Sequence, residues 1–136
     1  MSDVPAVRQV VLDGEDIRTL AEFYRELLGM EYPRGHETPV EGKDWLNLIG
    51  PVNLAFQKVN RLERATWPDD EVPQQLHLDM TVPDGEALER QRDRVLALGG
   101  RLLQNRADDP EEQLYVFADP AGHPFCIIVA PELYRI

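Results

Sequence analysis

Apolar and polar residues alternate along Gln75–Val82, near the middle of the chain. Alternation with a period of two places successive side chains on opposite faces of a β-strand. One face carries apolar residues, namely Leu76, Leu78, Met80 and Val82. The other face carries His77, Asp79 and Thr81. Asp84 follows at a helix N-cap position, because its carboxylate can accept from the free N–H groups of the next turn. The segment therefore predicts a strand that turns into a helix.

The same pattern occurs earlier in the chain. Val7–Asp13, which includes Gln9, predicts a strand, and Asp16 is placed to cap the helix that follows. Apolar residues then recur with helical spacing: Ile17, Leu20, Ala21, Tyr24, Leu27 and Leu28. Gly29 ends this stripe, since glycine enters the left-handed cap conformation cheaply. His77 precedes Asp84 by the same interval at which Gln9 precedes Asp16. The chain therefore looks like one unit written twice.

The remaining segments complete two β-α-β-β-β repeats, at about 7–59 and 75–130. In the first repeat, strands are predicted after the helix at Met30–Arg34, Asp44–Ile49 and Val52–Val59. In the second, a helix over Gly85–Leu98 precedes strands at Arg101–Asn105, Glu112–Phe117 and Pro124–Val129. The last strand is almost wholly apolar and is predicted to be central. Polar, proline-containing Asn60–Pro73 is interpreted as a connection. We expect an α+β fold: one domain over residues 1–136, with an eight-stranded curled mixed sheet around a cavity and helices outside.

Composition excludes several classes of function. The net charge of −11, from 25 acidic and 14 basic residues, argues against a nucleic-acid partner, which needs clustered Lys and Arg. The longest apolar run, Phe125–Ala130, is too short to cross a bilayer. Cys126 is the single cysteine, so an intramolecular disulfide is impossible. With no basic and apolar leader at its start, the chain is expected to act in the cytoplasm without a membrane partner.

Several stretches together resemble motifs of the vicinal oxygen chelate superfamily. Phe23–Gly29 (FYRELLG) is similar to its F-Y-x-x-x-L-G motif, and Asp119–Phe125 (DPAGHPF) to its D-P-x-G-x-x-[FI] ending. With His77-Leu78-Asp79 between them, the resemblance is to the glyoxalase-like branch and covers about Val7 to Ala130. The superfamily includes glyoxalase I, extradiol dioxygenases, and fosfomycin- and bleomycin-resistance proteins. The resemblance implies a homodimer with a small-molecule ligand in the sheet cavity.

The resemblance also implies a position for a divalent metal such as Zn, Ni, Mn or Fe. Metal-dependent members place ligands on the first and fourth strands of each repeat, which correspond here to Gln9, Gln57, His77 and Cys126. Imidazole and carboxylate suit such a metal, whereas two neutral amides and a thiol make an unusual set. A two-His-one-carboxylate iron site for extradiol cleavage is therefore excluded. The alternative, no metal at all, stays open, with His77 as a hydrogen-bonded histidine in a polar pocket and Cys126 as a small buried residue.

The ligand pocket is predicted from the polar strand positions and nearby aromatic residues. Its candidates are Gln9, Trp45, Gln57, His77, Asp79, Tyr115 and Cys126. Two functions follow from the resemblance. The protein is a glyoxalase-like lyase or isomerase acting on a small oxygenated substrate, or a metal-free protein that sequesters a drug or metabolite, as in bleomycin resistance. An acidic dimer of the second kind would capture a cationic compound.

Overall fold

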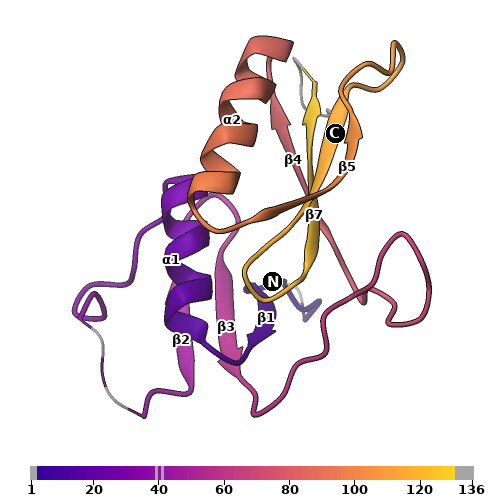
Figure 1. The fold of residues 1–136 in the computed structure, drawn as a ribbon. Helices are drawn as coiled ribbons and strands as arrows, with labels where there is room; N and C mark the ends of the chain where they lie inside the picture. The colour runs from indigo at the N-terminus through magenta and orange to yellow at the C-terminus, as the bar shows by residue number, and fades with distance from the viewer. Residues whose placement is uncertain (1–2, 39, 41, 131–136) are drawn as a thin grey trace. The chain divides into compact units, whose positions relative to one another are not determined.

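Each of the two predicted repeats forms its own sheet with one helix packed on it (Figure 1). A computed structural model describes residues 3–38, 40 and 42–130 of the chain. The chain divides into two units, Met1–Leu62 and Glu63–Ile136. The α+β class and the two βαβββ-type repeats are thus confirmed, with three strands in the first sheet and four in the second.

The first unit contains β1 (Val10–Gly14), α1 (Ile17–Leu28), β2 (Trp45–Leu48) and β3 (Leu54–Lys58). The strand order is β1-β3-β2, with β3 parallel to β1 and antiparallel to β2. A parallel pair needs a crossover connection, and the chain from α1 through β2 supplies it. One face of this sheet is therefore covered by α1, which contacts all three strands.

The ends of α1 are fixed as the sequence predicted. Asp16 accepts from the backbone N–H of Thr19 at 3.1 Å and from its hydroxyl at 2.8 Å. At the other end, Gly29 adopts φ 64°, the left-handed conformation that a side chain disfavours. Between them, the apolar stripe is buried: Ile17, Leu20, Ala21, Phe23, Tyr24 and Leu27. Tyr24 stacks on Phe56 of β3 with ring centroids 6.0 Å apart, which ties the helix to its sheet.

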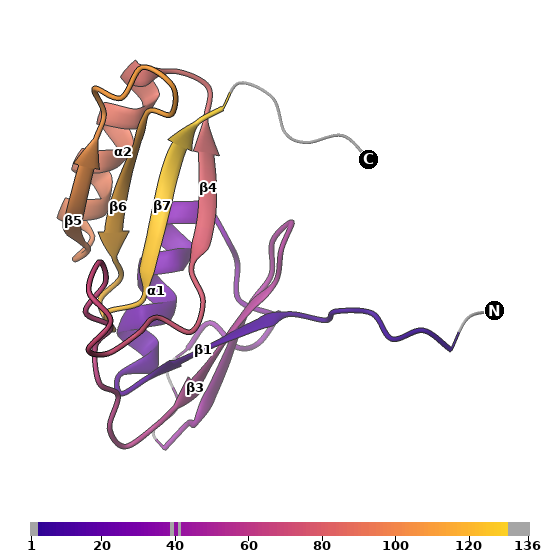
Figure 2. The ribbon, with the colours of Figure 1, turned by 90° about the vertical axis from the view of Figure 1, so that its right-hand side faces the viewer.

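The second unit contains β4 (Leu78–Val82), α2 (Gly85–Ala97), β5 (Arg101–Arg106), β6 (Leu114–Ala118) and β7 (Pro124–Val129). The four strands lie side by side in the order β4-β7-β6-β5 (Figure 2). β7 runs parallel to β4 and antiparallel to β6. The predicted interior position of the last strand is confirmed, and its continuous apolar run follows from that position.

The core of the second unit lies between α2 and one face of this sheet. Leu88 and Val95 of α2 are fully buried, as are Phe117 of β6 and Phe125 of β7. The rings of Phe117 and Phe125 lie 5.4 Å apart. Because side chains alternate between faces, the other face carries the residues between these. That face is the one that received His77 and Asp79 in the sequence pattern.

Two segments differ from their prediction. Met30–Arg34 is not a strand, since it contributes only the isolated bridge between Glu31 and Ile49; Pro33 lacks a backbone N–H and cannot extend the ladder. The connection at Asn60–Pro73 was interpreted as an unpacked link, yet Arg64 donates to the carbonyl of Pro120 at 2.8 Å. None of the helices within the described residues is long and apolar enough to span a membrane.

Candidate functional site

A row of three residues crosses the open face of the second sheet. Val116 of β6 pairs with Cys126 of β7, which in turn pairs with Asp79 of β4. The thiol of Cys126 donates to Oδ1 of Asp79, with the two atoms 2.6 Å apart. Nε2 of His77, one residue before β4, lies 3.3 Å from the same oxygen. The alternation read in the sequence therefore brings His77, Asp79 and Cys126 together.

The three side chains differ in exposure, and the difference sets their chemistry. Cys126 is 8% exposed, whereas the side chains of His77 and Asp79 are 49% and 58% exposed. Burial, followed by the hydrogen bond to Asp79, raises the pKa of the Cys126 thiol to about 12. Cys126 is therefore a protonated donor near neutral pH, and His77 and Asp79 are the groups that a ligand can reach.

A cavity of about 80 Å³ lies beside this row. Its wall includes Trp67, Gln74, His77, Val116 and Cys126. Sequence reasoning did not select Trp67 or Gln74, because both lie in or next to the segment interpreted as a connection. The available signal was a tryptophan in a polar segment, since so large an apolar side chain is usually packed.

The loop that carries Trp67 is closed by its own hydrogen bonds. The backbone N–H of Thr66 donates to the carbonyl of Val72 at 2.8 Å. In return, the N–H of Val72 donates to the hydroxyl of Thr66 at 2.8 Å. This closure, together with the bond from Arg64 to Pro120, gives the segment a fixed place at the cavity.

Tyr115 does not belong with these residues, and its predicted place in the pocket is corrected. It precedes Val116 on β6, so its side chain falls on the opposite face, toward α2. Its hydroxyl donates to Oε1 of Glu89 at 2.6 Å, and Arg92 approaches the same hydroxyl at 3.5 Å. Tyr115 thus anchors α2 to the sheet.

The remaining pocket candidates belong to the first unit. Trp45 and Gln57 are cross-strand partners on β2 and β3, and Nε1 of Trp45 donates to Oδ1 of Asn47 at 3.0 Å. Gln57 also pairs with Asp13 on β1. Gln9 is partly exposed and comes directly before β1. The structure therefore places Trp45 and Gln57 side by side on the polar face of the first sheet.

The strand register corrects one predicted correspondence between the repeats. Val11 and Asp79 each lie five residues before a helix cap, Asp16 or Asp84. Val11 pairs with Ala55, whereas Asp79 pairs with Cys126. Ala55, which is fully buried, is thus the counterpart of Cys126, and the match with Gln57 was wrong by two residues. The first repeat has no donor side chain at that position.

The side chains at hand do not fit a metal centre. Over residues 3–38, 40 and 42–130, no three His, Cys, Asp or Glu side chains are placed to hold a metal ion together, and this includes His77, Asp79 and Cys126. The Cys126 thiol stays protonated and donates its proton in a hydrogen bond to Asp79, whereas a metal binds the thiolate. Gln57 and Gln9 offer neutral amide oxygens, which are weak ligands beside imidazole and carboxylate.

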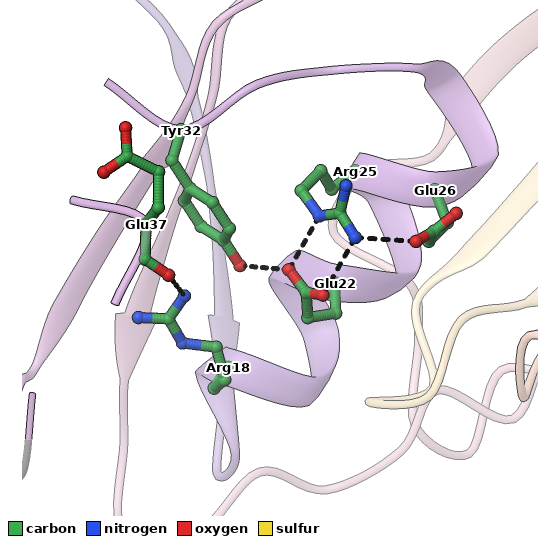
Figure 3. A network of polar contacts seen from close by, with 6 residues as sticks. All are labelled: Arg18, Glu22, Arg25, Glu26, Tyr32 and Glu37. Atoms are coloured by element: carbon green, nitrogen blue, oxygen red, sulfur yellow. Dashed lines mark hydrogen bonds and ion pairs between the residues drawn. The ribbon is translucent and has the colours of Figure 1, made fainter. Parts of the chain in front are cut away.

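A separate polar cluster occupies the first unit (Figure 3). Glu22 of α1 accepts from Nε of Arg25 at 2.8 Å and from the hydroxyl of Tyr32 at 2.7 Å. The guanidinium of Arg18 lies 4.8 Å from the centre of the Tyr32 ring. Glu22, Arg25 and Tyr32 border a recess of about 470 Å³ that Glu31 also lines. Arg25 and Tyr32 already satisfy the Glu22 carboxylate, so the cluster serves to fix Tyr32 against α1.

Comparisons with known proteins agree with this architecture. The family model of the glyoxalase-like domain matches residues 9–128. Among curated proteins, no match to the chain was found. A glyoxalase-related enzyme from Fulvimarina pelagi superposes with a TM-score of 0.67 at 22% identity, over 94% of this chain and 90% of that one.

Two further solved structures share the fold. A glyoxalase/bleomycin resistance protein/dioxygenase family enzyme from Burkholderia phytofirmans gives a TM-score of 0.65 at 17% identity, over 88% of this chain and 94% of that one. The second is a FosX fosfomycin resistance protein from Listeria monocytogenes, a mutant complexed with Mn(II) and a dihydroxypropylphosphonic acid. It gives a TM-score of 0.67 at 16% identity, over 93% of this chain and 91% of that one. At these identities the likeness concerns the fold alone.

Proposed function

Because the chain belongs to the glyoxalase-like domain family of the vicinal oxygen chelate superfamily, we propose that it binds a small organic molecule on the open face of its second sheet. One observation carries the proposal: beside a cavity, Cys126 donates to the carboxylate of Asp79, and His77, which is reachable from solvent, lies 3.3 Å from the same carboxylate. Packing of the strand does not require an imidazole at an exposed position. Contact with the bound molecule is therefore the function proposed for His77.

The chemistry of the group favours binding through His77. A neutral imidazole donates from one nitrogen and accepts at the other. Nε2 of His77 lies 3.3 Å from Oδ1 of Asp79, which leaves the other ring nitrogen for the ligand. Trp67 and Val116 supply apolar wall for the body of the molecule. The assignment requires no metal, and we expect the purified protein to bind its ligand without one.

A lyase or isomerase is the second candidate, favoured by the contact between His77 and Asp79. A histidine oriented by a carboxylate is a common general base, because the carboxylate stabilises the imidazolium formed on proton abstraction. A substrate with an acidic C–H or O–H next to His77 would meet that requirement. The two candidates differ in one respect: an enzyme converts its ligand, and a sequestering protein returns it unchanged.

The proposal extends to the setting of the protein. We expect a homodimer in the cytoplasm, where a lone cysteine stays reduced. With a net charge of −11, binding of a cationic ligand should weaken as salt is added. Light scattering of the purified chain tests the dimer, and a salt titration of ligand affinity tests the attraction.

The deciding experiment compares two histidine variants. A thermal-shift screen of metabolites and drugs on the untagged protein first identifies a ligand, and elemental analysis of the same sample measures bound metal. His77→Ala should then weaken the ligand clearly by calorimetry, while His36→Ala, in an exposed loop of the first unit, should not. Equal affinity in both variants would refute a binding role for His77. A mass-spectrometric search for a changed ligand separates enzyme from sequestering protein.

A further inference from the structure

One polar atom in the cavity wall lacks a partner. Among the described residues, Oε1 of Gln74 is one of two buried side-chain nitrogen or oxygen atoms that accept or donate no hydrogen bond, the other being Nε of Arg92. Buried carbonyl oxygens in folded proteins are almost always satisfied, by protein, water or ligand. Gln74 lines the same cavity as His77 and Cys126. A donor is therefore missing from this cavity.

Two of the neighbouring side chains do not provide that donor. The thiol proton of Cys126 is engaged by Asp79, and Nε2 of His77 lies 3.3 Å from the same carboxylate. A ligand group that carries an N–H or O–H can supply the missing bond to Oε1 of Gln74, whereas a carboxylate has no proton to donate to it.

The size of the cavity limits what can enter. A volume of about 80 Å³ is a few times the share of one water molecule in the liquid, about 30 Å³. A short carbon chain with one polar end fits such a space. Trp67 and Val116 would contact the chain, and the polar end would reach Gln74. The remainder of a larger molecule would pass out beside His77, whose side chain is half exposed.

We propose that this cavity takes the hydrogen-bond-donor end of a neutral or cationic small molecule, an ammonium, primary amide or hydroxyl group on a short apolar stem, which donates to Oε1 of Gln74. The inference rests on the proposed function, because it names the ligand class of the same site. Gln74 is then a specificity-determining residue: its unsatisfied oxygen favours ligands that donate a hydrogen bond over ligands that only accept one.

The test uses three probes that share one carbon skeleton: propionamide, propylammonium and propionate. Each is titrated into the isotope-labelled full chain, and the indole N–H of Trp67 and the side-chain amide of Gln74 are followed by NMR. The first two probes should shift both signals, and propionate should not. Gln74→Leu should weaken the two donors about tenfold, the effect of one well-placed hydrogen bond. Gln75→Leu, the same change at an exposed neighbour, should leave them unaltered.

Several results would overturn the inference. Propionate binding as well as propionamide would do so, as would unchanged donor affinity in Gln74→Leu or the failure of all three probes to shift Trp67. Should Gln74→Leu not fold, Gln74→Met keeps the length of the side chain and removes the oxygen. A screened ligand that weakens in His77→Ala but not in Gln74→Leu would refute only the donor assignment. A ligand indifferent to His77→Ala would refute the proposed function itself.

Discussion

Sγ of Cys126 lies 2.6 Å from Oδ1 of Asp79, and the two residues are direct partners on the parallel strands β7 and β4. The bond joins a buried thiol to an exposed carboxylate. Since the carboxylate accepts from the thiol and also faces His77, Asp79 links the interior of the sheet to the group that meets a ligand. A substitution at any of the three residues should therefore change the hydrogen bonding or charge environment of the other two.

The buried thiol should be unreactive in the folded protein. Burial and the bond to Asp79 raise the pKa of Cys126 from 9.0 to about 12, and the thiolate is the reactive form. At pH 8 we expect almost no labelling by a thiol reagent in buffer and complete labelling in denaturant. Rapid labelling of the native protein would show that the thiol is accessible and ionised.

The same pKa shift predicts a loss of stability at high pH. Because the folded thiol holds its proton longer than the unfolded one, its contribution is complete below pH 9 and declines as pH rises from 9 toward 12. The free energy of unfolding should fall by about 1.4 kcal/mol per pH unit in that range from this group. Urea unfolding of the natural chain and of Cys126→Ala measures this fall. The variant lacks the thiol, so the two pH dependences of the unfolding free energy differ by the contribution of Cys126.

Asp79→Asn should lower the pKa of Cys126 without restoring its ordinary value. The substitution removes the negative charge that disfavours the thiolate, yet burial, the larger cause, remains. Thiolate absorbance in the ultraviolet, followed against pH, reads the change directly. Thr81→Val, on the same strand and face, provides the control, since it leaves the carboxylate in place. An unchanged pKa in Asp79→Asn would mean that burial alone sets the value.

The fold was largely predictable because local patterns and tertiary structure agree. Asp16 and Asp84 stand before helical stripes, and both act as caps in the structure. Strand ends were less accurate: β1 begins at Val10 rather than Val7, and the Met30–Arg34 strand did not form. Hydrophobic alternation shows which residues prefer a sheet, but pairing also depends on available backbone donors, which Pro33 does not offer.

The site was predictable only in part. Alternation on a single strand sufficed to group His77 with Asp79, because parity within a strand is fixed. Parity between strands is not, since it depends on register and on loop lengths. For that reason Tyr115 was assigned to the wrong face. The Gln57 match differs from the observed register by two residues, which keeps the face and changes only the strand partner. Gln74 and Trp67 came to the cavity through tertiary contacts of a segment without any periodic pattern.

Asp119 should be a structural requirement of the turn before β7. It is fully buried, and Oδ1 accepts from the backbone N–H groups of Ala121 and His123 while Oδ2 contacts the ring of His123 at 2.8 Å. Asp119→Ala leaves these backbone N–H groups without an acceptor and should lower the unfolding free energy by about 3 kcal/mol. Asp119→Asn retains one acceptor oxygen and should cost less. Both are measured by urea unfolding.

A matched turn supplies the control for Asp119. Asp109 makes the same kind of turn, accepting from the N–H groups of Glu111 and Glu112 and from Arg106, but its side chain is 30% exposed. Water can replace those bonds, so Asp109→Ala should lower the unfolding free energy much less than Asp119→Ala does. Equal losses at the two sites would show that burial is not what makes Asp119 important.

Glu22 should give the first unit an acid-dependent share of its stability. The hydrogen bond from Arg25, assisted by that from Tyr32, lowers the pKa of Glu22 below its ordinary 4.5. A lowered folded pKa means that the contribution is present above pH 4.5 and disappears as pH falls through the folded value. Glu22→Gln should therefore lower the unfolding free energy at pH 7 by about 1 kcal/mol or less, since the side chain is 43% exposed. At pH 2 the variant and the natural chain should be equally stable. Glu26→Gln changes a more exposed partner of Arg25 and should lower the unfolding free energy at pH 7 by less. A loss of stability in Glu22→Gln that persists at pH 2 would mean that packing rather than charge holds Tyr32.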